Sequence, residues 1–210
     1  MECSDFVKQE YEVHWYDSIL IGDNYLGEKT MKRQQLRQLL LDYLPSEQEK
    51  ESKKIILDFL ASSEQVFERS HACGHITASG LLLNKERTHA LLMHHRKLDL
   101  WVQLGGHCDG DSDTRAVAIK EAQEESGLYG IACLSEGIFD IDVHWIPGNA
   151  KEAGHYHYDI RYLLAVNSDE QVVQNAESKE LRWVPIKGEL PTDSPSVMRM
   201  FDKCKKLFAQ

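Results

Sequence analysis

The chain has 210 residues, of which 42% are hydrophobic and 28% charged, a composition typical of globular rather than disordered proteins. Its 34 acidic and 24 basic residues give a formal net charge of −10, which disfavours binding to a nucleic acid polymer. The longest wholly apolar run, residues 162–166, is far shorter than the about 20 residues that a membrane-spanning helix needs. This charge still admits a small anionic ligand if local cations or a metal ion receive it.

The cysteines and the N-terminal residues predict a cytoplasmic protein. Residues 1–13 carry charges where a secretory signal peptide needs an apolar segment. Scattered cysteines without a Cys-x-x-Cys pair indicate a reducing compartment rather than a disulfide framework. The chain has five of them: Cys3, Cys73, Cys108, Cys133 and Cys204.

Residues 1–68 are predicted to form a helical N-terminal extension that packs on a main domain of residues 69–210. Leucines recur at helical spacing before Pro45, and a second apolar set follows a highly charged segment. These two sets are Leu36, Leu39, Leu40 and Leu44, then Ile55, Ile56, Phe59 and Leu60. Because no catalytic constellation is visible here, we expect the extension to be a structural cap.

The main domain has the pattern of a mixed sheet with few helices. β-rich segments separated by polar turns predict strands at residues 74–84, 89–95, 100–106, 137–147, 155–166 and 181–185. A helix is predicted over residues 113–126, with Gly127 at its C-cap, and a closing helix over residues 196–208. This order predicts an α+β fold, an α/β/α sandwich around a mixed β-sheet.

Three glutamates share one face of the predicted helix 113–126. Glu121, Glu124 and Glu125 stand at positions i, i+3 and i+4, where like charges repel each other by a few tenths of a kcal/mol. A bound divalent cation would reverse this repulsion, and carboxylate oxygens suit Mg²⁺ or Mn²⁺. The spacing alone leaves the alternative of a solvated acidic face open.

The segment around this helix resembles the Nudix hydrolase family, whose box reads G-x5-E-x7-R-E-U-x-E-E-x-G-U, with U an aliphatic residue. Gly106 matches the first glycine, and residues 120–128 match the second half of the box in register, so the box spans 106–128. The wider resemblance covers residues 69–190, where GHITAS, HHRKL, GGHCDGD and HYHYD resemble a bacterial Nudix subgroup. The resemblance implies an α/β/α Nudix sandwich.

Two positions depart from the box. Its loop glutamate is Ser112 and its arginine is Lys120, so the pair that braces the loop against the helix in the family is changed at both ends. We expect Asp111 or Asp113 to pair with Lys120 or Arg115 instead. A serine supplies no carboxylate, so any catalytic share of that glutamate is absent or relocated.

The resemblance implies hydrolysis of the diphosphate bond of a small-molecule substrate. Glu121, Glu124 and Glu125 would hold Mg²⁺ or Mn²⁺, which neutralises phosphate oxygens and activates a bound water. Glu124, beside Glu121, is the candidate catalytic base, and Glu180 is its rival. The resemblance leaves the substrate unidentified, and dimers are frequent in the family, so a homodimer is one expected assembly.

A basic cluster precedes the strand that leads into the box. Arg96 and Lys97, with Lys85 and Arg87 nearby, are the best cationic group in this acidic chain. We predict that Arg96 and Lys97 contact substrate phosphate, with Gly106 and His107 at the mouth of the box. An ordinary solvated strand end is the alternative.

Histidines cluster on two predicted strands near the box. His155 and His157 share one strand face with Asp159, and His144 comes from the preceding strand. With His107, they could ligate a softer metal such as Mn²⁺, Fe or Zn²⁺, contact the substrate, or fill a polar pocket. A separate alternation of His71, Cys73 and His75 suggests zinc only weakly, because it lacks Cys-x-x-Cys spacing.

Two alternatives to a hydrolase stay open. Ser112 and Lys120 are compatible with a catalytically weak Nudix-fold module that binds a ligand or acts as a sensor. Cys108 would be the nucleophile of an enzyme similar to isopentenyl-diphosphate isomerases. The full set of box glutamates favours hydrolysis over isomerisation.

Overall fold

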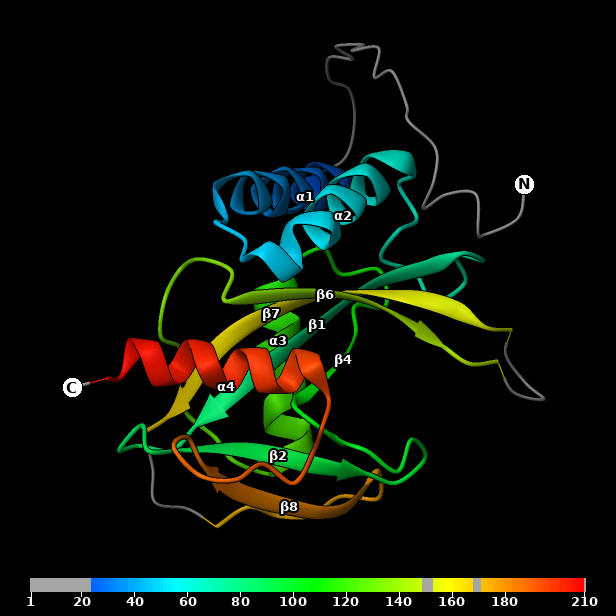
Figure 1. Cartoon of the computed structure of the whole chain (residues 1–210). Coiled ribbons are helices and arrows are strands. Elements are labelled where there is room, and N and C mark those ends of the chain that lie inside the picture. The colour runs from blue at the N-terminus through cyan, green and yellow to red at the C-terminus, as the bar shows by residue number, and fades with distance from the viewer. Residues whose placement is uncertain (1–23, 149–152, 168–170, 210) are drawn as a thin grey trace.

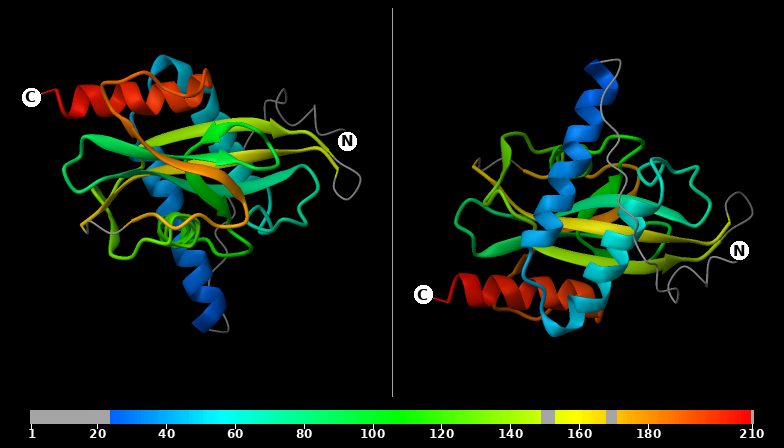
Figure 2. Two further views of the ribbon diagram at one scale, coloured as in Figure 1. Left: turned by 90° about the horizontal axis from the view of Figure 1, so that it is seen from below. Right: turned by 90° about the horizontal axis from the view of Figure 1, so that it is seen from above.

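The protein folds as a mixed sheet with helices on both faces (Figures 1 and 2). A computed structural model describes residues 24–148, 153–167 and 171–209. The predicted α+β fold is therefore confirmed. The part of the expected helical extension in residues 1–23 lies outside the described residues. No helix in the described ranges combines the length and apolar character needed to cross a bilayer.

Two long strands form the centre of the sheet. β1 (Gly74–Leu83) and β7 (His155–Val166) run parallel, from the pair Gly74–Tyr156 to the pair Leu83–Ala165. Each of these two strands also pairs with different strands at different positions along its length, so the sheet branches on both sides of the central pair. The flanking strands are β2 (His89–His95) and β4 (Leu104–His107) on β1, β5 (Ile131–Cys133) and β6 (Asp140–Ile146) on β7, and β3 (Trp101–Val102) and β8 (Ser178–Pro185) on β2.

The central strands are buried on both faces, which explains their long apolar runs. On β1, Leu82 faces one core, whereas Leu81 and Leu83 face another. Side chains of α1 (Asn24–Asp42), α2 (Lys50–Ser62) and α3 (Thr114–Ser126) complete the first core, and α4 (Pro195–Leu207) completes the second.

The helices before residue 68 share the first core with the sheet. Phe59 of α2 stacks on Tyr158 of β7, with ring centroids 3.7 Å apart and planes 7° from parallel. Leu36 and Leu40 are buried as expected, but Leu44 is 90% exposed because α1 ends at Asp42. The cap thus packs directly on the sheet, and the boundary at residue 68 stays a prediction.

Helix α3 confirms the local features of the sequence. The Asp113 side chain accepts a hydrogen bond from the Ala116 amide at 3.0 Å, which caps the N-terminus. Gly127 closes the helix in the left-handed conformation, with φ of 69° and its amide bonded to the Gln123 carbonyl. Sequence periodicity missed β5, a strand of only three residues.

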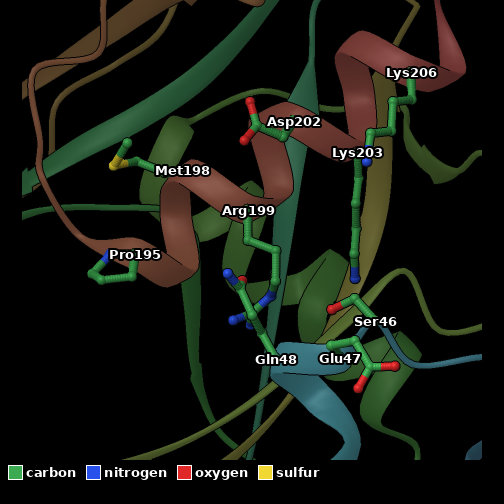
Figure 3. Close-up of a pocket in the computed structure, with 9 residues that line it drawn as sticks. All are labelled: Ser46, Glu47, Gln48, Pro195, Met198, Arg199, Asp202, Lys203 and Lys206. Atoms are coloured by element: carbon green, nitrogen blue, oxygen red, sulfur yellow. The ribbon is translucent and has the colours of Figure 1, made fainter.

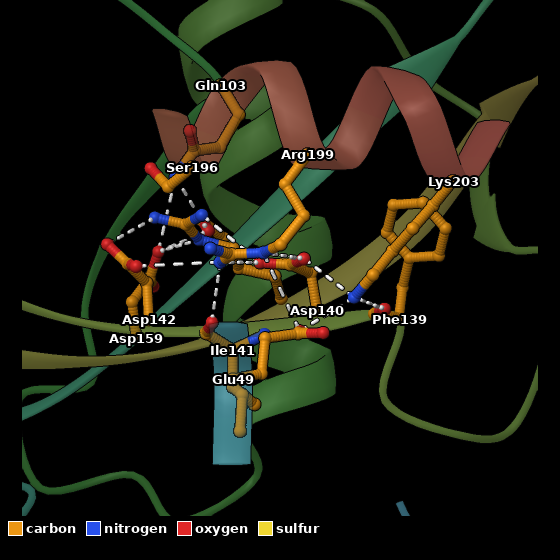
Figure 4. Close-up of polar contacts among 12 residues, drawn as sticks. Glu49, Gln103, Phe139, Asp140, Ile141, Asp142, Asp159, Ser196, Arg199 and Lys203 are labelled. Carbon is orange, nitrogen blue, oxygen red and sulfur yellow. Dashed lines mark hydrogen bonds and ion pairs between the residues drawn. The ribbon is translucent and has the colours of Figure 1, made fainter. Parts of the chain in front are cut away.

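A buried ionic network joins α4 to the sheet (Figure 4). Lys203 Nζ lies 2.6 Å from Glu49 and 2.7 Å from Asp140, and Arg199 lies 2.7 Å from Asp140. Burial alone would raise the pKa of Glu49, but hydrogen bonds from Lys203, Ser46 and the Tyr43 hydroxyl lower it to about 2. The network therefore fixes α4 on β6.

A hollow of about 590 Å³ lies between α4 and the 3-10 helix η1 (Glu47–Glu49) (Figure 3). Arg199 and Lys203, which line it, already bind Glu49 and Asp140. No residue of the box and no predicted phosphate-binding residue is among those that line it. The chemistry predicted from the sequence therefore lies elsewhere.

Candidate active site

A second cavity, of about 310 Å³, collects residues from the box and from the central strands. Strand β4 and helix α3 supply one wall, with Gly106, His107, Glu121 and Glu125. Strands β6 and β7 supply another. These elements meet because β4 pairs with the middle of β1 (Thr77–Gly80) on one side and β7 pairs with β1 on the other.

Two adjacent glycines bring the helix carboxylates against β4. A Cβ at Gly106 would lie 2.5 Å from Glu121 Oε2, so a larger residue would displace that carboxylate. The Gly105 amide donates a hydrogen bond to Glu125 Oε2 at 2.8 Å. A Cβ at Gly105 would overlap Ser79 on the neighbouring strand. Gly106 therefore allows the Glu121 carboxylate of α3 to approach β4, and Gly105 allows β4 to approach β1.

The electrostatics of this wall favour a bound cation. Burial raises the pKa of Glu125 to about 8, against the Gly105 hydrogen bond, and the neighbouring Glu121 and Glu177 charges raise it further. Burial also raises the pKa of Glu121, which has Lys120 Nζ only at 3.7 Å. Two crowded, desolvated carboxylates are the donor set that suits a hard divalent cation, so these residues fit the metal that the box implies.

The three box glutamates do not share one environment. Glu125 is 4% exposed and Glu121 lines the cavity, but 58% of the Glu124 side chain is exposed. Glu124 lies 3.5 Å from Lys120 and is not among the residues that line the cavity. Glu180 is similarly outside, 2.7 Å from Arg182. The structure thus places two of the three predicted ligands in the cavity.

One acidic residue of the cavity was missed by sequence reasoning. Glu177 lines it from the loop before β8, and its charge raises the pKa of both Glu121 and Glu125. Its loop is held by Arg96, whose side chain donates to the carbonyls of Ala176 and Ser178 at 3.0 and 2.8 Å. No sequence pattern marks Glu177, because only this loop geometry brings it to the box.

The predicted basic cluster divides in the same way. Lys97 lines the cavity, as predicted for a phosphate contact. Arg96 does not line it, because its guanidinium is used on the loop before β8. A second cation in the lining, Arg69, was not expected and forms paired hydrogen bonds with Asp109.

The prediction that Asp111 or Asp113 pairs with Lys120 or Arg115 in the box loop was wrong. Asp113 caps α3, and Asp111 accepts a hydrogen bond from the Asp113 amide at 2.9 Å. Arg115 pairs with Glu136, while Lys120 lies near Glu121 and Glu124. Ser112, in place of the family's glutamate, is buried. The N-cap at Asp113 and the hydrogen bond of Asp111 thus hold the loop, and Lys120 stays on the helix surface.

A buried carboxylate organises the floor of the cavity. Asp159 accepts hydrogen bonds from Thr77 at 3.0 Å, Ser79 at 2.8 Å, Gln103 at 3.2 Å and Arg161 at 2.8 Å. Arg161 continues to Asp140 and Asp142, so the floor is continuous with the ionic network of Figure 4. Because its oxygens are occupied by these donors, Asp159 positions strands rather than ligands.

The predicted histidines lie close together at and behind the cavity wall. His107, His144 and His157 line it, and His155 lies behind, with its Nε2 3.3 Å from that of His157. His144 Nδ1 lies 3.1 Å from Asp142. Burial lowers the pKa of His157 to about 2, helped by the neighbouring imidazoles.

The weak zinc prediction from His71, Cys73 and His75 grouped the wrong residues. His75 lies with His155 and His157, while the His71 ring meets the edge of Phe59 at 5.3 Å and its Nδ1 contacts the Gly74 carbonyl. His75 was therefore assigned to the wrong partners, because its true neighbours are about 80 residues away in the sequence.

Cys108 is not placed as a nucleophile. The thiol is 4% exposed in the first core, and burial raises its pKa well above the ordinary value. It does not line the cavity. The isomerase alternative therefore lacks its attacking group.

Comparison with known proteins agrees with the geometry. The model of the NUDIX domain matches residues 74–201, more than half of the chain, so the chain belongs to the Nudix family. By that membership it is a hydrolase of pyrophosphate bonds. A search of curated proteins finds no match.

Solved structures share the fold at low sequence identity. A Caenorhabditis elegans Ap4A hydrolase binary complex is 16% identical, with a TM-score of 0.52, over 64% of this chain and 97% of that one. A NUDIX-family hydrolase from Clostridium perfringens is 24% identical, with a TM-score of 0.47, over 63% and 97%. At 16% identity, the similarity to the Ap4A hydrolase shows the fold alone.

Proposed function

We propose that the chain hydrolyses a small-molecule diphosphate, with Mg²⁺ or Mn²⁺ held by Glu121 and Glu125. The observation that carries this proposal is the pair of desolvated carboxylates set against Gly105 and Gly106. Glu124 is exposed and outside the cavity, so we infer that it contributes least of the three box glutamates.

The chain's own residues divide the work of the reaction. The cation, when bound, neutralises phosphate oxygens and lowers the pKa of a water molecule. Lys97 and Arg69 receive the remaining phosphate charge at the cavity wall. Glu177 is the better candidate base, because it lines the cavity whereas Glu124 and Glu180 do not. It would accept the proton of the attacking water.

The group attached to the diphosphate meets an aliphatic wall. Met93, Leu98, Val102 and Ile146 line the cavity beside Lys97. In the described part of the lining, the aromatic rings are all imidazoles. These contacts favour a nucleoside or a group of similar size held by apolar packing, rather than a base stacked on an indole or phenyl ring.

An assay on a panel of nucleoside diphosphate derivatives tests the proposal. We expect cleavage of the diphosphate into two phosphate monoesters with Mg²⁺ or Mn²⁺, no cleavage after chelation, and strong loss of cleavage in both Glu121→Gln and Glu125→Gln. Undiminished turnover in both variants would overturn the ligand assignment. Silence across the panel with tight binding by calorimetry would favour the sensor alternative, which rests on Ser112 and Lys120.

A further inference from the structure

We propose that His75, His155 and His157 form a zinc site beside the cavity, which His157 lines. The central strands bring them together, because His75 of β1 is the register partner of His157 on the parallel strand β7. His155 precedes His157 by two residues and so shares its face of β7. The proposal does not depend on the hydrolysis of any substrate.

The nitrogens lie close enough for one ion to contact all three rings, and one separation matches that of two ligands on a tetrahedral ion. One ring nitrogen from each of the three histidines lies within 4.8 Å of the others. The two Nε2 atoms of His155 and His157 are 3.3 Å apart. Two nitrogens bound to zinc at about 2.0–2.1 Å and at the tetrahedral angle are about 3.3–3.4 Å from each other.

His75 supplies an independent observation. Its side chain is 1% exposed, and neither ring nitrogen has a hydrogen-bond partner among the residues that the structure describes. Buried polar groups in native proteins almost always have a partner, so an orphaned imidazole facing two others points to an absent ligand. A metal ion would satisfy one of these nitrogens directly.

The surroundings of His155 fit a metal ligand. Its Nδ1 lies 2.9 Å from the Ala153 carbonyl, which takes the proton and leaves Nε2 with its lone pair toward His157. Metal-binding histidines commonly donate their other ring N–H to a backbone carbonyl or carboxylate in this way. The arrangement fixes both the tautomer and the ring orientation.

The ligand chemistry selects a borderline transition metal rather than Mg²⁺. All three donors are imidazole nitrogens, which suit zinc, whereas the carboxylates of α3 suit hard cations. The His107 ring, with its centroid 4.9 Å from that of His75 and 5.0 Å from that of His157, borders the cluster on the cavity side. A three-histidine ion there has a fourth position for His107 or a cavity ligand.

The test measures zinc rather than activity. The chelated full-length protein is loaded with ZnCl₂, desalted and assayed for bound metal, and the zinc environment is examined by X-ray absorption. We expect one zinc per chain with a nitrogen and oxygen shell at about 2.0–2.1 Å. His75→Asn and His157→Asn should each bind zinc at least about 100-fold more weakly.

Matched variants keep the result decisive. His89→Asn, on β2 outside the cluster, and Glu125→Gln should retain one zinc, which separates this site from the α3 carboxylates. Circular dichroism checks the folding of each variant. If His75→Asn fails to fold, zinc binding by His157→Asn and the X-ray absorption spectrum of the wild type still test the zinc site. No retained zinc in the wild type, unchanged zinc in His157→Asn, or sulfur in the shell would overturn the proposal.

Discussion

Two parts of the site present different ligand chemistries. At the oxygen end, beside α3, Glu121 and Glu125 offer carboxylate oxygens next to a glycine pair of β4. At the nitrogen end, on β1 and β7, two buried histidines and one half-buried histidine offer ring nitrogens. The residues of the oxygen end are close in sequence, whereas the histidines come from two strands that are far apart in sequence. We therefore expect the two ends to bind different cations, so that substitutions can remove each site alone.

Removing the oxygen end should have the largest effect. We expect Glu125→Gln to lower kcat/KM by about 10²–10³-fold, corresponding to about 3–4 kcal/mol of transition-state stabilisation. Steady-state kinetics with Mg²⁺ measure the change. Glu136→Gln, on the surface beside Arg115, is the matched control and should keep full activity.

The ionic network behind both ends should govern acid stability. Glu49 has a folded pKa of about 2, below its ordinary 4.5, so its stabilisation is present above about pH 4.5 and is lost as pH falls toward 2. We expect Glu49→Gln to lower the free energy of unfolding by about 2–3 kcal/mol near pH 6. Urea titrations at pH 6 and pH 3 should show this gap narrowing, and a constant gap would contradict the assignment.

The glycine pair distinguishes the site from its support. We expect Gly106→Ala to displace the Glu121 carboxylate and lower kcat/KM by about 10–30-fold, or about 1.4–2 kcal/mol, with a small change in Tm. In Gly105→Ala the added Cβ would overlap Ser79 on β1, so this variant should lower Tm more than Gly106→Ala does. Kinetics with thermal melts compare the two, and equal effects on both quantities would break the distinction.

The cations at the oxygen end should give the smallest effect. Lys97→Ala should raise KM by about 5–10-fold relative to the wild type. The increase in KM should be larger at low salt, because salt screens an exposed charge. Lys85→Ala serves as the comparison, since Lys85 is an exposed cation of the same predicted cluster that does not line the cavity. A rise in KM for Lys85→Ala as large as that for Lys97→Ala would contradict the assignment.

Local features of the sequence predicted the oxygen end well. The helix predicted over residues 113–126, with Gly127 as its C-cap, is observed as α3 (Thr114–Ser126), because caps and periodicity depend on neighbouring residues. Helical spacing placed Glu124 with Glu121 and Glu125, but β4 covers only part of that face, so Glu124 is exposed.

The nitrogen end could be predicted only in part. Alternation placed His155 and His157 on one face of a strand, as observed. Their third partner, His75, depends on the register of two parallel strands, which no local pattern encodes. Glu177 and Arg69 were also missed, because no local sequence pattern encodes the loop packing that brings them to the cavity.

Manganese binding to the zinc-free protein tests the central claim most directly. Electron paramagnetic resonance titrations of the wild type, Glu125→Gln and His157→Asn measure free Mn²⁺ against the total. We predict that Glu125→Gln loses Mn²⁺ binding while His157→Asn keeps it. Wild-type affinity in Glu125→Gln, with binding lost in His157→Asn, would contradict the assignment of the hydrolytic metal to the carboxylates.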